Sequence, residues 1–423
     1  MKVATVDLTR LNKAAQTLTA ISQRRKAVGD KVDELYFGML GEQCRQLATA
    51  KERGKLVVYH TVSMPIELFY AMDVVPLSLE WICNTVVSLA RAYQEVYEAA
   101  SSWGFKIEVC SGHRMMNGAI IQGMFPHPDA VFWSNQVCDN TAKAGDFMME
   151  ACGCPGFFLD KPYYPGEIEY RYFVKQLDDM VKFLERLTGK KMDWDRMGEV
   201  MDNSRQSLEL WRQIFELRKP VPCPANNRLL VYLLSLDNYA GSPEYLNYLQ
   251  CLRADLQAKM NKGIAGVPEE KHRLMSFMMA PQHSFKLLDW IAGSHRAVIV
   301  SEPFIPVCPE DVKFDRAKPL DSIARKYLYY AITAGAHTSL TESNYMLRTL
   351  QHARDFKIDG AIFWAHVVCR QSNPLIKMVK DALMQEFGVP TVTMDFDACD
   401  PTYTTEDKLK DTLDGFFEML DER

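Results

Sequence analysis

The sequence predicts an α/β protein with two parallel-sheet domains, a helical N-terminal segment and a helical middle region. Short apolar runs alternate with helical patterns in two separate blocks, from Lys55 to about residue 162 and from about residue 274 to the C-terminus. Strands that alternate with helices form parallel sheets through right-handed crossovers. A chain of 423 residues is also too long for one ordinary hydrophobic core, so two or three domains are expected.

The first block follows a helical segment. Residues 8–53 repeat apolar positions at intervals of three and four and carry no strand signal, so we expect helices there. Beyond them the predicted strands are LVVYHT (56–61), VVPLSL (74–79), KIEV (106–109), AVFWSNQV (130–137) and GFFLDKP (156–162). The predicted helices between them cover 65–72, 85–103, 114–125 and 139–153, the first of which Pro65 can start.

The middle of the chain, from about 166 to 262, is almost wholly helical in pattern. Within it the segment PVPCPANN (220–227) contains three prolines and marks a domain boundary. The second block has predicted strands at 274–281, 297–304, 360–367 and 390–397, and predicted helices at 321–335, 344–356 and 406–420. The predicted organisation is therefore a helical segment (1–53), a first α/β domain with a helical extension (54–219) and a second α/β domain (220–423). Both sheets are expected to be Rossmann-like.

Composition excludes several functional classes. Hydrophobic content of 48% and charged content of 24% are typical of a globular protein. The net charge of −5 and the lack of a basic run give no reason to expect nucleic acid or a membrane surface. No apolar stretch approaches the roughly 18 residues that span a bilayer, and the N-terminus lacks a signal peptide's apolar core. We therefore expect a cytoplasmic protein.

Three of the eleven cysteines follow predicted strands. Cys110 follows KIEV, Cys138 follows AVFWSNQV, and Cys369 follows GAIFWAHV. Ligand groups in open α/β sheets gather at the carboxyl ends of strands, so these thiols can converge. In a reducing compartment convergent cysteines indicate metal or redox chemistry, and soft thiolates suit iron–sulfur clusters. No C-x-x-C motif is present, and loop cysteines are more often incidental than ligands.

The residues after these cysteines strengthen the hypothesis. Each cysteine is followed by polar or small residues, SGHR, DNTAK or RQSN, that can present backbone N–H groups at the start of a helix. Such donors stabilise the negative charge of a cluster. The histidines that adjoin predicted strand ends, His60, His113 and His366, are a weaker signal, because a lone histidine is more often a hydrogen-bonded polar residue than a ligand.

Glu80 is the candidate acid–base residue. It ends the apolar run VVPLSL and precedes Trp81, and an apolar, aromatic environment raises a carboxyl pKa toward a useful range. The alternative is a glutamate that starts a helix and faces water. Ser63 lies at the end of the first strand, on the same expected edge of the sheet. It can hydrogen-bond a substrate carbonyl, or it can cap the helix that Pro65 starts.

These segments together resemble the superfamily of 2-hydroxyacyl-CoA dehydratases and benzoyl-CoA reductases. The resemblance extends from about Gly54 to the C-terminus. It is carried, in order, by GKLVVYHTVSMPIELFYAMDVVPLSLE, VCSGHR with Cys110, DAVFWSNQVCDNTAK with Cys138, DGAIFWAHVVC with Cys369, GVPTVTMDFDACDPTY and a last helix ending FFEML. The chain lacks Walker A, G-x-G-x-x-G, G-x-S-x-G and H-E-x-x-H motifs, so other nucleotide, hydrolase and zinc-peptidase chemistries are not indicated.

The resemblance implies a definite activity. Cys110, Cys138 and Cys369 would hold a 4Fe–4S cluster at a domain interface, with the fourth iron open. A separate ATP-hydrolysing activator with its own cluster would inject one electron. The thioester carbonyl of an (R)-2-hydroxyacyl-CoA would be reduced to a ketyl radical, and loss of the 2-hydroxyl and a 3-proton would give the enoyl-CoA. Glu80 and Ser63 would be the acid–base carboxylate and a serine that contacts the substrate.

The resemblance also implies a partner, and it leaves alternatives. Such subunits pair with a related subunit, as a heterodimer, or form a homodimer. Ser-Gly-His follows the first cysteine where the family commonly has Ser-Tyr or Ser-Phe, so a reductase branch with the same scaffold stays open. Cys83, Cys152, Cys154 and Cys308 keep open a branch that holds a double-cubane 8Fe cluster. A non-catalytic subunit that carries a cluster and relays electrons is the third alternative.

Overall fold

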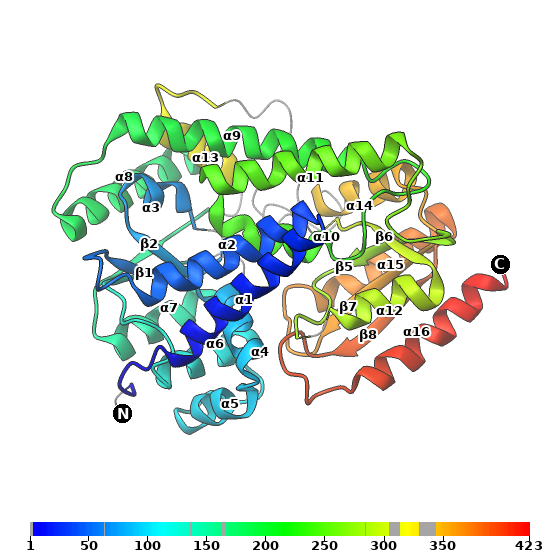
Figure 1. The fold of residues 1–423 in the computed structure, drawn as a ribbon, viewed down its shortest axis with the longest axis horizontal. Coiled ribbons are helices and arrows are strands. Elements are labelled where there is room, and N and C mark those ends of the chain that lie inside the picture. The colour runs from blue at the N-terminus through cyan, green and yellow to red at the C-terminus, as the bar shows by residue number, and fades with distance from the viewer. Residues whose placement is uncertain are drawn as a thin grey trace. The chain divides into compact units, whose positions relative to one another are not determined.

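A computed structural model describes residues 3–62, 64–135, 138–162, 166–283, 285–303, 314–329 and 344–423. The chain forms two compact units, each with its own sheet (Figure 1). The first unit contains residues 1–209, 235–251 and 308–331, and the second contains 210–234, 252–307 and 332–423. The predicted class, an α/β protein with two parallel sheets, is confirmed.

The first unit is built on a four-stranded parallel sheet in the order β2-β1-β3-β4. Its strands are β1 (Val57–His60), β2 (Val75–Ser78), β3 (Ala130–Ser134) and β4 (Gly156–Leu159). Every residue of β1, β2 and β3 is buried, as expected for apolar runs that helices cover on both faces. Four of the five strands predicted in this block are therefore confirmed.

The fifth predicted strand, KIEV, is wrong. Residues 106–109 form a turn between α5 (Tyr93–Ser102) and α6 (Ser111–Ile121), and the side chain of Ile107 is 66% exposed. The predicted helix 85–103 is also divided, into α4 (Asn84–Ala90) and α5, because Arg91 takes a left-handed conformation with φ of 53°. Cys110 therefore follows a turn rather than a strand.

Helices form the N-terminal segment, and they also form the middle region, whose residues are divided between the two units. The helices predicted for 8–53 are confirmed by α1 (Thr9–Ala27) and α2 (Lys31–Ala48). The Asp30 carboxylate caps α2 by accepting a hydrogen bond from the Asp33 N–H at 3.1 Å. The helical middle region is confirmed as well. It consists of α8 (Glu167–Thr188), α9 (Trp194–Glu216), α10 (Leu229–Leu236) and α11 (Pro243–Asn261).

A buried ion pair attaches α13 (Pro319–Tyr329) to the first unit, although this helix follows β6 of the second unit in the sequence. Lys326 Nζ lies 2.6 Å from a carboxylate oxygen of Glu67 on α3 (Ile66–Ala71), and both side chains are almost fully buried. The same oxygen accepts from Ser204 at 2.7 Å, while the hydroxyl of Tyr327 donates to the carbonyl of Met64. Removing either charge would leave the other buried and unpaired, so this pair holds α13 in place.

The second unit repeats the design of the first. Its strands are β5 (His272–Phe277), β6 (Ala297–Ser301), β7 (Gly360–His366) and β8 (Thr391–Phe396), all parallel in the order β6-β5-β7-β8. The helices α12 (Lys286–His295), α14 (Asn344–Asp355), α15 (Ile376–Phe387) and α16 (Glu406–Asp421) accompany them. The four strands predicted here are confirmed.

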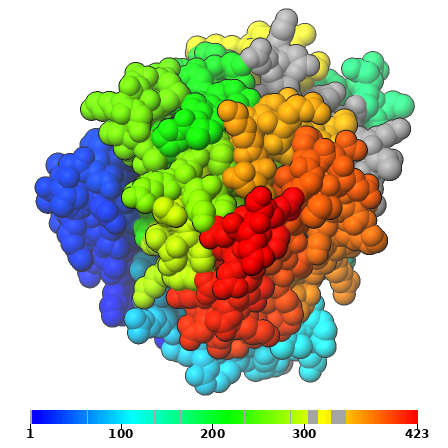
Figure 2. All heavy atoms as spheres, turned by 90° about the vertical axis from the view of Figure 1, so that its right-hand side faces the viewer, coloured from blue at the N-terminus to red at the C-terminus, as the bar shows by residue number. Residues whose placement is uncertain are grey.

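The last helix lies on the surface of the second unit, where it is red in Figure 2. It buries one side, including Leu413 and Phe417, and contacts β8 and α12. Among the described residues no helix is both long and apolar enough to cross a membrane.

Candidate functional site

The order of the strands indicates where a ligand site belongs. In each sheet the second strand lies on one side of the first strand, and the third strand lies on the other side. The connections therefore diverge at the carboxyl ends of β1 and β3, and again at those of β5 and β7. Open α/β sheets bind ligands in the crevice at such a switch point. Among the candidate residues, Cys138 follows β3 and Cys369 follows β7, while Glu80 follows the neighbouring strand β2.

Glu80 lies at this edge of the first sheet. It is on a π-helical turn, η1 (Leu79–Cys83), directly after β2, and such turns are frequent at functional sites. One carboxylate oxygen accepts from the Val62 N–H at 3.2 Å, beyond the end of β1. The other oxygen is buried and has no hydrogen-bond partner among the described residues. Burial raises the pKa of Glu80 to about 7, which confirms the raised pKa that the sequence predicts.

The other predicted substrate contact, Ser63, lies outside the described residues. Its neighbours nevertheless belong to the same edge. The Nδ1 of His60 lies 3.0 Å from the Thr61 carbonyl oxygen, so Nδ1 carries the proton and donates it. The Nε2 of His60 then has only a lone pair, and burial lowers the pKa of the ring to about 4. The roles of Glu80 and Ser63 in chemistry stay predictions.

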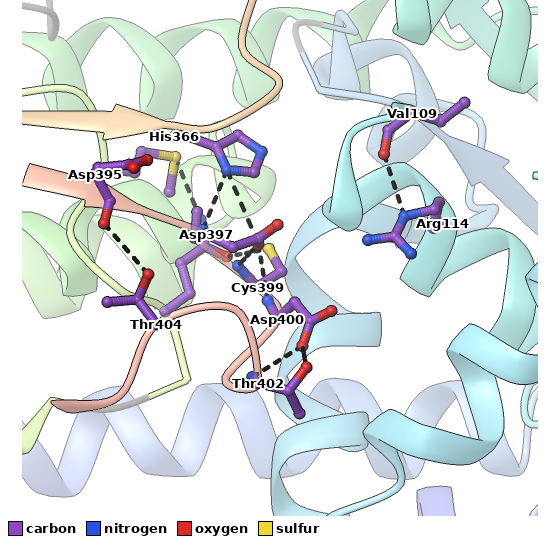
Figure 3. Close-up of polar contacts among 12 residues, drawn as sticks. Val109, Arg114, His366, Asp395, Asp397, Cys399, Asp400, Thr402 and Thr404 are labelled. Carbon is purple, nitrogen blue, oxygen red and sulfur yellow. Dashed lines mark hydrogen bonds and ion pairs between the residues drawn. The ribbon is translucent and has the colours of Figure 1, made fainter. Parts of the chain in front are cut away.

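Cys110 is the N-cap residue of α6. Arg114, in the first turn of this helix, donates from Nε to the Val109 carbonyl at 3.2 Å (Figure 3). Its guanidinium also lies 4.8 Å from the centre of the Tyr97 ring, a distance suited to a cation–π contact. Although no strand precedes Cys110, these contacts hold its backbone at the positive end of a helix dipole, where a thiolate is stabilised.

Cys138 is the N-cap residue of a second helix, α7 (Asp139–Cys152), which follows β3. Its sulfur lies 3.4 Å from the hydroxyl oxygen of Thr141, in the first turn of α7. The same hydroxyl lies 3.4 Å from Nε2 of His113, in the first turn of α6. The structure therefore brings the beginnings of α6 and α7 together, and with them the segments of two of the three predicted ligands.

Cys369 lies in the second unit, beyond the end of β7 as predicted. The carbonyl oxygen of His366, the last residue of β7, accepts from the Cys369 N–H at 2.9 Å and from the Asn373 side chain at 3.0 Å. These bonds fold the chain into a tight turn that presents the cysteine. Its membership of one site with Cys110 and Cys138 joins residues of two units and stays a prediction.

A second loop, which follows β8, contacts His366, the residue whose carbonyl forms this turn (Figure 3). The Asp397 carboxylate, after β8, accepts from the N–H groups of Cys399 at 2.9 Å and Asp400 at 2.8 Å. The Ala398 N–H donates to Nδ1 of His366 at 3.2 Å, so the proton of the neutral ring is on Nε2. The ends of β7 and β8 are thus connected through His366.

Sequence reasoning missed Lys161, which follows β4 at the same edge of the first sheet. Lys161 is only 2% exposed, and burial lowers the pKa of its ammonium group to about 7. The Asn135 side chain, after β3, accepts from the Lys161 N–H at 3.0 Å and donates to its carbonyl at 2.8 Å. The available signal was a pair of charged residues, Asp160 and Lys161, that follows the apolar run GFFL inside the predicted strand 156–162.

Replacing Lys161 by methionine is expected to raise the free energy of unfolding at pH 7. The unfolded chain keeps an ordinary lysine pKa of 10.5, whereas burial lowers the folded value to about 7. The unfolded state therefore binds more protons below pH 10.5, so the stability of the unsubstituted protein rises with pH between about 7 and 10.5. Each unit of pKa difference corresponds to about 1.4 kcal/mol. Thermal unfolding followed across this pH range measures the effect.

The control for this prediction is Lys143→Met, since the Lys143 side chain is 85% exposed. The gain at pH 7 should occur in Lys161→Met alone and should vanish as the pH approaches 10.5. A Lys161→Met protein that unfolds at a lower temperature than the unsubstituted one at pH 7 would show that the ammonium stabilises the fold.

The additional cysteines behave as packing residues. Cys83 is fully buried, and burial raises its pKa well above the ordinary value; burial also raises the pKa of Cys152 to about 12 and that of Cys154 to about 11. Cys308 lies outside the described residues. Within the described part of the chain, no three His, Cys, Asp or Glu side chains are grouped so that they could hold a metal ion.

The chemistry of the donors at Cys110 and Cys138 nevertheless fits an iron–sulfur cluster. Both thiols begin helices, where N–H groups and the dipole favour negative charge. A hydroxyl also lies within hydrogen-bond distance of the Cys138 sulfur. Hydrogen bonds to cysteine sulfurs are a recurrent feature of cluster sites.

Comparison with known proteins agrees with the resemblance in the sequence. The model of the family described as "2-hydroxyglutaryl-CoA dehydratase, D-component" matches residues 61–420. The (R)-phenyllactyl-CoA dehydratase alpha subunit of Clostridium sporogenes is 23% identical over 417 residues, covering 95% of this chain and 98% of the relative. The (R)-2-hydroxyisocaproyl-CoA dehydratase alpha subunit of Clostridioides difficile is 24% identical, covering 91% and 95%. One subunit of the benzoyl-CoA reductase of Thauera aromatica is 22% identical, covering 70% and 72%.

Proposed function

The chain belongs to the 2-hydroxyglutaryl-CoA dehydratase D-component family and is a subunit of a dehydratase-type enzyme; on this premise we propose that it removes water from an (R)-2-hydroxyacyl-CoA. Cys110, Cys138 and Cys369 would hold a 4Fe–4S cluster, and the enzyme would be oxygen-sensitive and cytoplasmic. A 3-proton with no adjacent carbonyl is too weak an acid for any side-chain base, so the substrate must first gain an electron. The cluster, when bound, would supply that electron.

One observation carries this proposal within the structure. Two of the proposed ligands, Cys110 and Cys138, are N-cap residues of α6 and α7, whose first turns meet through Thr141 and His113. This arrangement favours two thiolates on neighbouring helix ends, as a cluster requires. The chain's own contribution is to hold these two cysteines at helix N-termini and to place the Thr141 hydroxyl beside the Cys138 sulfur.

Glu80 would move the substrate proton. Its pKa of about 7 lets it exist as carboxylate or carboxylic acid near neutral pH, so it can accept and return a proton. The oxygen bonded to the Val62 N–H holds the group in place, and the second oxygen is the one available to a substrate. Ser63 would hydrogen-bond the substrate carbonyl from the same edge of the sheet.

A second candidate function is reduction of an acyl-CoA by the same scaffold. The observation that favours it is the match to the benzoyl-CoA reductase of Thauera aromatica. A branch with a double-cubane 8Fe cluster would need further thiolate ligands. A subunit that only relays electrons would have no need for Glu80, and a buried carboxyl with a pKa of about 7 argues for a catalytic role.

The proposal includes two protein partners. The similar dehydratase and reductase chains are each named as one subunit of an enzyme. We therefore propose a related second subunit, or a second copy of this chain, with an interface well above the roughly 1,600 Å² of a standard complex. The separate ATP-dependent activator with its own iron–sulfur cluster would deliver electrons. The apolar helices of the 166–262 region are the proposed contact surface.

Anaerobic co-production with the second subunit tests the function. With activator and ATP, we expect (R)-2-hydroxyacyl-CoA to be converted to enoyl-CoA by an assembly larger than the 48.4 kDa chain. Omission of the activator is the control and should abolish turnover. Full activity in a monomeric fraction would contradict the proposed assembly, and reduction of benzoyl-CoA without dehydration would favour the second candidate.

A further inference from the structure

Three side chains at the beginnings of α6 and α7 form a connected series, of which the proposed chemistry uses only Cys138. The Cys138 sulfur lies 3.4 Å from the Thr141 hydroxyl oxygen, which lies 3.4 Å from Nε2 of His113. Thr141 is 1% exposed and His113 is 7% exposed, so water competes little for these bonds. The contact between Thr141 and His113 joins residues that are 28 positions apart in the sequence.

The position of these residues in their helices explains why they meet. Cys138 is the N-cap residue of α7, and Thr141 is the third residue of that helix. The backbone N–H of Thr141 donates to the Cys138 carbonyl at 3.1 Å, which turns the hydroxyl back toward the sulfur. His113 is likewise the third residue of α6, behind its N-cap residue Cys110. Each of the two helices therefore begins at a cysteine and has a polar side chain at its third position, and these two polar side chains meet.

Close packing fixes α6 and α7 against their neighbours in the fold. A Cβ at Gly118 of α6 would stand 1.9 Å from the carbonyl oxygen of Val96, so α6 lies directly against α5. A Cβ at Gly145 of α7 would stand 1.9 Å from the Trp133 ring of β3. Only glycine permits these two contacts, which fix α6 against α5 and α7 against β3.

The available protons decide which atom donates in the contacts of Thr141 with Cys138 and His113. A cysteine that holds the cluster is a thiolate, which has no proton and can only accept, so its hydrogen bond with Thr141 uses the hydroxyl proton. The oxygen of Thr141 then has only lone pairs for His113, whose Nε2 must carry a proton. A hydroxyl that accepts one hydrogen bond donates a stronger one, because each bond polarises the next.

We propose that His113 is a positioning residue that acts through Thr141 on the Cys138 thiolate, and thereby raises the reduction potential of the cluster and slows its loss. This inference rests on the proposed 4Fe–4S cluster. A donor to a ligand sulfur withdraws electron density and favours the reduced cluster. The bond also holds the Cys138 side chain in one conformation. His113 follows Cys110 in the segment where this chain departs from the Ser-Tyr or Ser-Phe that is common in the family.

Three substitutions test separately the contact of Thr141 with Cys138 and the contact of His113 with Thr141. Thr141→Val removes the hydroxyl and preserves the shape, His113→Leu removes the Nε2 donor, and Thr141→Ser retains the hydroxyl. In the full chain, purified anaerobically and loaded with iron and sulfide, we expect Thr141→Val to shift the midpoint potential downward and to lose iron to a chelator about ten-fold faster. His113→Leu should shift both quantities in the same direction by less, and Thr141→Ser should behave like the unsubstituted protein.

The matched control is Thr188→Val on α8, where the hydroxyl donates to the Leu184 carbonyl in its own helix. It should leave the potential and the rate of iron loss unchanged. The double variant Thr141→Val with His113→Leu should equal Thr141→Val alone, because His113 acts only through the hydroxyl. Thermal unfolding of the cluster-free variants shows whether they are folded, and Thr141→Ser supplies the answer if Thr141→Val is not.

The outcomes distinguish this inference from the proposed function. An unsubstituted protein that binds no cluster under these conditions would overturn both. An unsubstituted protein that binds the cluster, with Thr141→Val and His113→Leu unchanged in potential and iron retention, would overturn the role of His113 alone. Additive shifts in the double variant would show that His113 acts by a route other than Thr141.

Discussion

Cys369→Ala protein, purified without oxygen, is expected to retain little of the iron that the unsubstituted chain holds. One cubane cluster requires about four iron and four sulfide per chain, and the loss of one of three protein ligands leaves it weakly held. Cys369 follows β7 in a turn fixed by the His366 carbonyl, as a ligand position requires. Iron and sulfide analysis with the visible absorption spectrum measures the loss.

Cys251→Ala is the matched control for this substitution. Cys251 lies within α11, in the helical middle region, and follows no strand. Its replacement should leave the iron content unchanged. Equal iron in the two variants would refute the ligand assignment, and about eight iron per unsubstituted chain would favour the double-cubane branch.

Glu80→Gln is expected to lower turnover by roughly 10²-fold or more while the iron content stays unchanged, the usual scale for losing a positioned acid–base group. Glutamine keeps an oxygen that can accept from the Val62 N–H, so the local structure should persist. What it loses is the ability to bind and release a proton. Steady-state turnover, with iron analysis of the same samples, measures both effects.

The raised pKa of Glu80 also predicts the direction in which turnover changes with pH. A carboxylate that accepts the substrate proton must be deprotonated, and burial raises the pKa of Glu80 to about 7. Turnover should therefore rise as the pH increases through about 7, and this rise should be absent from Glu80→Gln. Glu98→Gln, an exposed position on α5, is the control and should preserve both turnover and its pH profile. Loss of iron from Glu80→Gln would instead assign Glu80 a structural role.

The same burial that suits Glu80 to proton transfer has a cost in stability. A carboxyl whose pKa is raised on folding is favoured in its neutral form, so its contribution to stability diminishes as the pH rises from about 4.5 toward 7. A functional site is a place where such a cost is expected. The sequence indicated this environment, because Glu80 directly follows an apolar run and precedes Trp81.

The apolar runs determined most of the secondary structure. Segments such as AVFWS and GAIFWAH are short, mostly apolar runs of the kind that forms a strand covered on both faces, and they form β3 and β7. KIEV resembles a strand in sequence because Ile107 and Val109 alternate with charged residues, which is the pattern of a half-buried strand. In the structure β1 and β3 already have neighbours on both sides, and the segment remains a turn.

The strand order, and with it the convergence of distant residues, was decided only by the tertiary structure. The sequence by itself determined the type of fold and the neighbourhoods of Cys138, Cys369 and Glu80, since each depends on residues adjacent along the chain. The contact of His113 with Thr141, and the burial of Lys161, depend instead on which helix ends and strands pack side by side. Local patterns record whether a side chain is to be buried, whereas its partner is selected by packing among segments that the chain brings together only on folding.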